Sequence, residues 1–284
     1  MEITPATFEA VDDYNDAMIL TARRLAVIGG HGILPKSDLN VHIIVVEDMV
    51  EVRIASLEAV SRSGHFIQIG DDSFSRHCPD ASGRECYVVV HPAGSDEQLI
   101  NGVPLVSPKY SYDFCHIDNI GHDAIPIGKL LLKNDKWAVQ ELYIPPCLTM
   151  SAHPELLAWI HKCSLSLNII LSHLSTLLSN QELVMMRFLA IELENYDGNE
   201  MPKHFYLLLK KIVMALGMMK INITDLPALP DEPIFNNDDI MLSLVPLTDY
   251  LSRFEAAVTT QKPHREEPLR KPPVVGEIWD AETR

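Results

Sequence analysis

The sequence predicts an α+β fold, in which an N-terminal helix and an antiparallel β-sandwich or barrel precede an antiparallel four-helix bundle. Two observations carry this prediction. Between residues 40 and 143, short runs of alternating apolar and polar residues are joined by tight turns, a pattern typical of antiparallel sheets. From residue 154 onward, apolar residues recur at intervals of three and four, which is the period of amphipathic helices.

Composition and charge exclude several classes of protein. Of 284 residues, 47% are apolar and 22% are charged, which is ordinary for a globular chain with a sizeable core. The formal net charge is −16, and such an acidic balance repels both phosphate backbones and anionic membrane surfaces. We therefore expect no nucleic-acid partner.

The cysteines and the N-terminal sequence indicate a reducing compartment. The five cysteines are scattered without a CxxC pair. The acidic N-terminus "MEITPATFEAVDDYND" has no basic region followed by an apolar run, so we expect no signal peptide. No apolar stretch approaches the roughly 20 residues that span a bilayer. The sequence predicts a soluble cytoplasmic protein without direct membrane insertion.

The first element is a helix with a narrow apolar seam. Thr4 is suited to cap it, Pro5 suits its first position, and Gly29–Gly30 ends it. Two interpretations stay open: the seam packs on its own domain, or it meets a partner chain, where a polar seam residue would fix the register. The seam residues are Phe8, Val11, Asn15, Met18, Ala22 and Leu25.

Strands are predicted from residue 40 to about residue 143. Glu47–Asp48 form a turn between "NVHIIVV" and a second run, in which Val50, Val52 and Ile54 alternate with charged residues. A late hairpin joins "IPIGKLLLK" to "KWAVQELYI" through Asn134–Asp135. Short strands at close intervals favour an antiparallel sandwich or barrel.

The segment "ELYIPPCLTM", residues 141–150, predicts a stiff interdomain joint. Each proline removes a backbone donor and fixes φ, so the pair does not fit a central strand. Proline also favours an extended residue before it, which holds the joint residues in extended form. We therefore expect Tyr143, Ile144, Pro145 and Pro146 to fix the sheet domain against the helices.

Four amphipathic stripes, a proline-rich acidic loop and a charged tail complete the chain. The stripes cover residues 167–178, 183–193, 205–219 and 240–258, with Pro246 either kinking or starting the last helix. The tail contains "KPHREEPLRKPP", which is typical of flexible segments, and "VVGEIW", a short partner-binding candidate. The expected domains are 1–150 for the N-terminal helix and β shell, 151–258 for the bundle and 259–284 for the tail.

Motifs for catalysis are sparse. "GGHGILP" lacks a third glycine and a following helix, so we interpret it as a helix stop and turn. No GxSxG or SxxK motif occurs, and Cys147 beside the prolines suits a buried apolar role. One cluster keeps a metal-dependent enzyme as the least favoured hypothesis: His116, Asp118, His122 and Asp123. We therefore expect no catalytic residue, cofactor or bound metal.

The order of features resembles a known family. "HGILPKSDLNVHI" is followed by a β region, then by "IPIGKLLL", then by "ELYIPPCLTMSAHPELL" and a helical bundle. This order is similar to TssK, the baseplate subunit of bacterial type VI secretion systems, in its Bacteroidetes-type form. The most specific pieces are "GILP", "IPIGK" and "YIPPCL", in register over about 160 residues.

The resemblance implies a structural role without a cofactor. It implies a cytoplasmic homotrimer at the inner membrane, whose shell attaches to TssF- and TssG-like wedge proteins. Family members usually continue into a C-terminal domain that docks on the membrane complex, whereas here only a charged tail follows the last helix. Contact with the membrane complex is therefore expected to be indirect or through the tail. The alternative is an adaptor of a phage tail or another contractile injection device.

Overall fold

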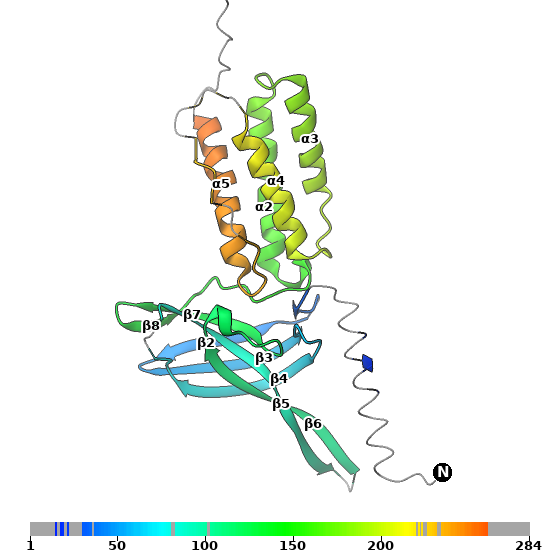
Figure 1. Cartoon of the computed structure of the whole chain (residues 1–284), viewed down its shortest axis with the longest axis vertical. Helices are drawn as coiled ribbons and strands as arrows, with labels where there is room; N and C mark the ends of the chain where they lie inside the picture. Colours follow the sequence, from blue (N-terminus) through cyan, green and yellow to red (C-terminus); the bar gives the residue numbers. More distant parts are fainter. Residues whose placement is uncertain are drawn as a thin grey trace, which may run out of the picture.

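The computed structural model places two antiparallel sheets at one end and four helices at the other (Figure 1). The described residues are Asn15, Met18, Ile19, Ala22 and the ranges 30–35, 37–80, 83–100, 103–219, 221, 223, 226–231 and 234–260.

The first sheet is built around β3 (Met49–Val60). On one side β3 pairs with β2 (Asn40–Val46) and β1 (Gly32–Ile33), and on the other with β4 (Phe66–His77), all antiparallel. The predicted turn is confirmed: Glu47, with φ at 56°, joins β2 to β3. The predicted alternation is confirmed as well, because Val50, Val52 and Ile54 are buried and alternate with exposed Glu51 and Arg53.

The second sheet has the order β6–β5–β7–β8. Its strands are β5 (Glu85–Ile100), β6 (Val103–Cys115), β7 (Ile125–Lys133) and β8 (Lys136–Val139). The predicted late hairpin is confirmed: Asn134 and Asp135 have φ of 50° and 60°, as a tight two-residue hairpin turn requires. Its second strand is shorter than expected, because Tyr143 N–H donates to Gln140 O in a turn after β8.

The expectation of short strands is wrong for β5 and β6, which have 16 and 13 residues. β7 pairs with β5 only between Glu85 and Val90, so the rest of the β5–β6 hairpin extends beyond the sheet (Figure 1). A register shift between Pro92 and Ser95 interrupts the hairpin, and Gly94 there has a φ of 104°. This bulge and the polar residues around it hide the alternation that would mark one long strand.

The two sheets close on each other along β4 and β6. The Phe74 and Tyr112 rings stack with centroids 4.1 Å apart, and Arg76 lies 3.0 Å from Asp113. On the other side, Gly128 of β7 leaves room for Ile43, whose Cδ1 lies 2.0 Å from where a Cβ would be. The sheets therefore curl around a shared apolar core.

The helices are α2 (Pro154–Leu174), α3 (Asn180–Glu194), α4 (Pro202–Gly217) and α5 (Ile240–Thr260). Their beginnings are encoded locally. Pro154 and Pro202 occupy first-turn positions, and Ser179 forms a reciprocal capping box with Glu182. Pro246 lies inside α5 rather than at its start. Among the described helices, none is both long enough and apolar enough to cross a membrane.

The α+β class and the antiparallel sheets are confirmed, but α5 departs from the predicted alternation of directions. The segment after α4 returns along the bundle: Leu229 lies against Gly217 at the end of α4, and the Phe235 ring lies 5.6 Å from that of Tyr206 near its start. Consequently α2, α4 and α5 begin at the sheet end and only α3 runs the other way (Figure 1). A long acidic loop, rather than a short connection, makes this possible.

One apolar core spans sheets and helices. Fully or almost fully buried side chains from both parts form a continuous cluster, including Ile54, Leu130, Ile144, Leu156 and Leu251. The cluster includes residues from both sides of the expected domain boundary at residue 150, so the sheets and the bundle are packed as one body.

Gly32 in β1 is predicted to be irreplaceable. Its φ is 129°, and a Cβ there would lie 2.2 Å from Pro146 O. We expect Gly32→Ala to lower the free energy of unfolding by at least ~2 kcal/mol, measured by urea denaturation. The control is Gly70→Ala in β4, where a Cβ meets nothing within 4 Å. Equal stability of the two variants would contradict this account.

Candidate functional site at the junction of sheets and helices

The proline joint is packed rather than exposed. Ile144 and Cys147 are 2% and 1% exposed, and both prolines between them are buried. Pro146 O accepts a hydrogen bond from Ile33 N–H at 2.8 Å, and Leu148 N–H donates to Ile33 O at 3.0 Å. The glycine-rich segment therefore lies beside the joint and pairs with it, and Cys147 takes the buried position expected for it.

A buried carboxylate pair at the start of α5 faces this joint. Asp238 and Asp239 are 2% and 0% exposed, although they belong to a loop that reads as acidic and solvated. Asp239 accepts hydrogen bonds from Lys129 Nζ at 2.8 Å and from Tyr87 OH at 2.7 Å. Its other oxygen accepts one from Leu242 N–H at 3.3 Å, which caps the first turn of α5.

Lys129 of β7 is the cation that balances Asp239. It is 3% exposed, also pairs with Glu85 at 2.9 Å, and lies 4.9 Å from the centroid of the Tyr87 ring. An unpaired ammonium at this depth would be strongly disfavoured, so the two carboxylates and the ring face make the position tenable.

Asp238 joins the other edge of the sheets to α5. His31 Nε2 lies 2.7 Å from Asp238 Oδ1, and Arg62 pairs with the second carboxylate oxygen. The backbone takes part too: Tyr143 OH donates to Asp238 O at 2.7 Å, and Asn237 Nδ2 donates to His31 O at 2.7 Å. We call Asp238, Asp239 and their partners the junction network.

Burial keeps the polar partners of the carboxylates in one protonation state. Desolvation, and then the neighbouring Arg62 guanidinium, lowers the pKa of His31 to about 3, so the imidazole is neutral and Nε2–H donates to Asp238. Desolvation also raises the pKa of Tyr87 and of Tyr143 well above the ordinary value, so both remain donors. The junction network therefore holds its arrangement around neutral pH.

The arrangement suits structural support better than catalysis. In the described part of the chain, every buried side-chain nitrogen or oxygen has a hydrogen-bond partner. Asp238 and Asp239 each face a cation, and no hydroxyl or thiol is paired with a histidine base there. Perturbed pKa values mark structural ion-pair networks as well as active sites.

The histidine and aspartate cluster of the loop after β6 is not gathered into a metal site. Asp123 contacts His65 at 3.0 Å and Ser63, whereas the His116 ring packs against Gly83. Among the described residues, no group of three or more histidine, cysteine, aspartate or glutamate side chains is placed to hold a metal. His116, Asp118, His122 and Asp123 are close in sequence, which was the only basis of the least favoured, metal-dependent hypothesis.

The N-terminal seam is placed only in part. Asn15, Met18 and Ala22 are helical and exposed, with Met18 at 53%. Phe8, Val11 and Leu25 lie outside the described residues. Both interpretations of the seam, packing on its own domain and contact with a partner chain, stay predictions.

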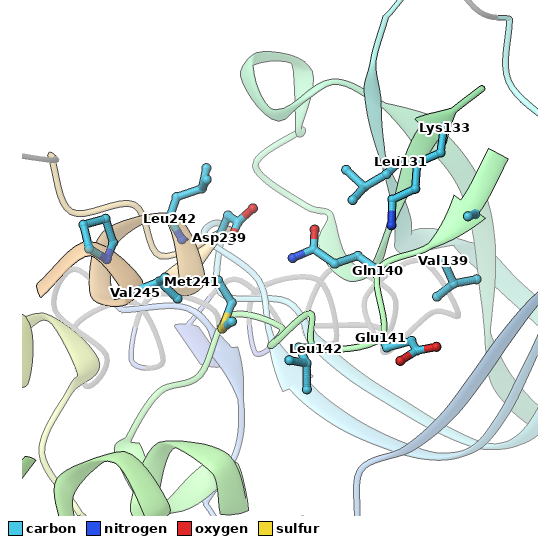
Figure 2. A pocket seen from close by; sticks show the side chains of 12 residues that line it. Leu131, Lys133, Val139, Gln140, Glu141, Leu142, Asp239, Met241, Leu242 and Val245 are labelled. Carbon is cyan, nitrogen blue, oxygen red and sulfur yellow. Dashed lines mark hydrogen bonds between the residues drawn. The ribbon is translucent and has the colours of Figure 1, made fainter. Parts of the chain in front are cut away.

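An apolar cleft of about 680 Å³ opens beside the junction network, between the segment after β8 and the start of α5 (Figure 2). Leu131 and Val139 line its sheet side, and Leu142, Leu242 and Val245 line the rest. Asp239 also lines the cleft and links it to the network. Sequence reasoning missed this cleft because its two walls are about 100 residues apart in the chain.

No family model and no curated protein sequence matches the chain. Its fold, however, is similar to solved structures. A chain of the type VI secretion TssK–TssF–TssG baseplate subcomplex aligns with a TM-score of 0.60 at 13% identity, covering 90% of this chain and 97% of that one. TssK of the EAEC system, in complex with nanobody nb18, gives 0.61 at 15%, covering 87% and 68%. A further TssK crystal structure gives 0.60 at 12%, covering 90% and 70%.

This chain has the TssK fold. The likeness covers both the sheets and the bundle, so the resemblance expected from "GILP", "IPIGK" and "YIPPCL" is confirmed for the fold. All three motifs lie near the junction of sheets and helices. "YIPPCL" contains the joint, Ile33 of "GILP" pairs with it, and Lys129 of "IPIGK" pairs with Asp239.

The Lys129–Asp239 pair should contribute strongly to stability. We expect Lys129→Met to lower the free energy of unfolding by about 3–5 kcal/mol, because Asp239 would stay buried without its cation. The control is Arg53→Met, whose pair with Asp71 is at 3.6 Å between side chains 70% and 80% exposed. That change should stay within about 1 kcal/mol of the unmodified chain. Chemical denaturation of both variants decides the matter, and a neutral Lys129→Met would contradict the assigned role.

His31 should make stability depend on pH. Its pKa is about 3 in the folded chain and 6.5 ordinarily, so between these values protons bind the unfolded chain preferentially. Its contribution is complete above pH 6.5 and is lost as pH falls toward 3. The loss at pH 5 is about 2 kcal/mol. His31→Gln should flatten denaturation midpoints between pH 7 and 5, whereas His77→Gln, 80% exposed beside Asp48, should not. Parallel pH profiles for His31→Gln and the unmodified chain would refute this assignment.

Proposed function

We propose that this chain is a structural baseplate component of a type VI secretion system, acting as a trimeric adaptor between the baseplate wedge and the membrane complex. One observation carries the proposal: the likeness to solved TssK structures, and to a chain of a TssK–TssF–TssG baseplate subcomplex, covers about nine-tenths of this chain and so includes both sheets and bundle. The partners are TssF- and TssG-like wedge proteins, with any membrane contact indirect and the location cytoplasmic beside the inner membrane.

A mechanical role needs two binding ends held in a fixed relation. In the proposed division of labour, residues 1–150 form the shell, 151–258 the bundle and 259–284 a tail. The packed joint at Tyr143–Pro146 and the junction network connect the two ends without a loose linker. The role requires neither a catalytic residue nor a cofactor, and the charge-balanced junction is consistent with a protein that is not an enzyme.

The surface of α3 supports self-association. Val184, Phe188 and Ile191 recur at intervals of four and three on one face, and they are 52%, 68% and 52% exposed. Met185 beside them is 42% exposed. The opposite face of α3 is buried through Met186, Ala190 and Leu193, so the helix is apolar on two sides. A second apolar face on a bundle helix is typical of an interface between subunits.

The proposed assembly predicts a native mass of about 96 kDa, three times 31.9 kDa, by light scattering. The chain should also co-purify with TssF- and TssG-like proteins that are co-expressed with it. Phe188→Glu should yield monomers, because a charge would be buried at the interface. Leu207→Glu on α4, a side chain 44% exposed, is the matched control and should leave the trimer intact.

The joint is tested in the same co-purification. Pro145→Gly with Pro146→Gly should weaken recovery of the wedge proteins more than it weakens folding, because glycine releases φ in the joint. Unchanged recovery together with unchanged stability would remove the joint from the mechanism. A monomer at all concentrations that also fails to retain the wedge proteins would contradict the adaptor function.

A further inference from the structure

The cleft beside the junction network has a strongly apolar opening. Leu142 is 67% exposed, Leu242 is 51% exposed and Val245 is 40% exposed, and the three lie around the same opening (Figure 2). The volume of about 680 Å³ is within the range of sites that hold ligands or anchoring side chains. Covering such a surface with an apolar segment removes it from water and thereby lowers the free energy of the protein.

The cleft also carries charges of both signs. Lys133 and Glu141 line it and are exposed, and both belong to the region of β7, β8 and the turn after them (Figure 2). A complementary segment would therefore combine apolar anchors with a basic and an acidic flank.

The sequence after α5 contains such a segment. Residues 274–279 read "VVGEIW" and supply Val274, Val275, Ile278 and Trp279 within a charged, proline-containing tail. Arg270 and Lys271 precede this segment, Glu277 lies in its C-terminal half and Asp280 directly follows it. Tryptophan with neighbouring aliphatic side chains is the typical anchor of a small apolar pocket.

The chain is long enough to bring this segment back to the cleft. From Leu242 to Thr260, α5 is roughly 27 Å long. Residues 261–274 reach about 46 Å when extended, so Val274 can return from the end of α5 to the cleft at its start. Pro272–Pro273 directly precede the segment and favour an extended approach.

We propose that residues 274–279 dock into the cleft between the segment after β8 and the start of α5, with Trp279 as the apolar anchor. Arg270 and Lys271 then face Glu141, and Glu277 or Asp280 faces Lys133. The docked tail covers Leu142 and Leu242. It then connects sheets and helices in addition to the proline joint and the junction network. This docking does not depend on the baseplate role.

A photocrosslinking experiment on the full chain tests the docking. p-Benzoylphenylalanine replaces Trp279, and after irradiation the attached peptides are identified by mass spectrometry. We expect attachment within residues 139–142 and 241–246. Leu242→Glu should reduce the yield by about tenfold, and so should Leu142→Glu, whose side chain is exposed enough to tolerate the change. Leu207→Glu is the control and should keep the full yield.

A mixture of chains labelled with ¹⁴N and chains labelled with ¹⁵N shows which chain supplies the tail. Crosslinked peptide pairs that carry both isotopes come from two different copies. Attachment within one copy is the expected result. Attachment only between copies would overturn docking within the chain and make the tail an arm toward a second subunit. Attachment at other sites, or a yield that Leu142→Glu and Leu242→Glu both leave unchanged, would overturn the proposal.

Discussion

The structure depends on two carboxylates that are buried where α5 meets the sheets. Asp238 and Asp239 are adjacent in sequence but face different partners, one reaching His31 and Arg62 and the other Lys129 and Tyr87. Together they tie the beginning of one helix to both sheets. Like charges in apolar surroundings are tolerable only because each has its own cation, so this point defines a single position for α5.

That position has consequences for the rest of the bundle. Since α5 must begin at the sheets, the chain leaving α4 at the far end has to return along the bundle, and Leu229 and Phe235 lie against α4 on the way. The hydrogen bond from Ser166 Oγ to Glu255, at 2.6 Å, then holds the C-terminal half of α5 against α2. The proline joint and the junction network act at the same place, and the continuous apolar core fills the space between them.

Local signals were enough to predict much of this architecture. The alternation of Val50, Val52 and Ile54 and the Asn134–Asp135 turn depend on neighbours in sequence, and both are found as expected. The junction network was not foreseeable in that way, because His31 and Asp238 are 207 residues apart and Tyr87 and Asp239 are 152 apart. An aspartate pair in a proline-rich acidic loop reads as solvated unless its partners are known. The direction of α5 was missed for the same reason, since it follows from those pairs and not from the helix itself.

The shared direction of α2, α4 and α5 gives the bundle an electrical polarity. Each helix carries a partial positive charge at its N-terminus and a partial negative charge at its C-terminus. Three N-termini therefore meet at the sheets and only that of α3 lies at the far end, so the backbone dipoles do not cancel as they would in an alternating bundle. Carboxylates lie where the positive ends gather, with Asp239 capping α5 and Glu155 in the first turn of α2. At the opposite end the field has the reverse sign, because the C-termini of α2, α4 and α5 lie there.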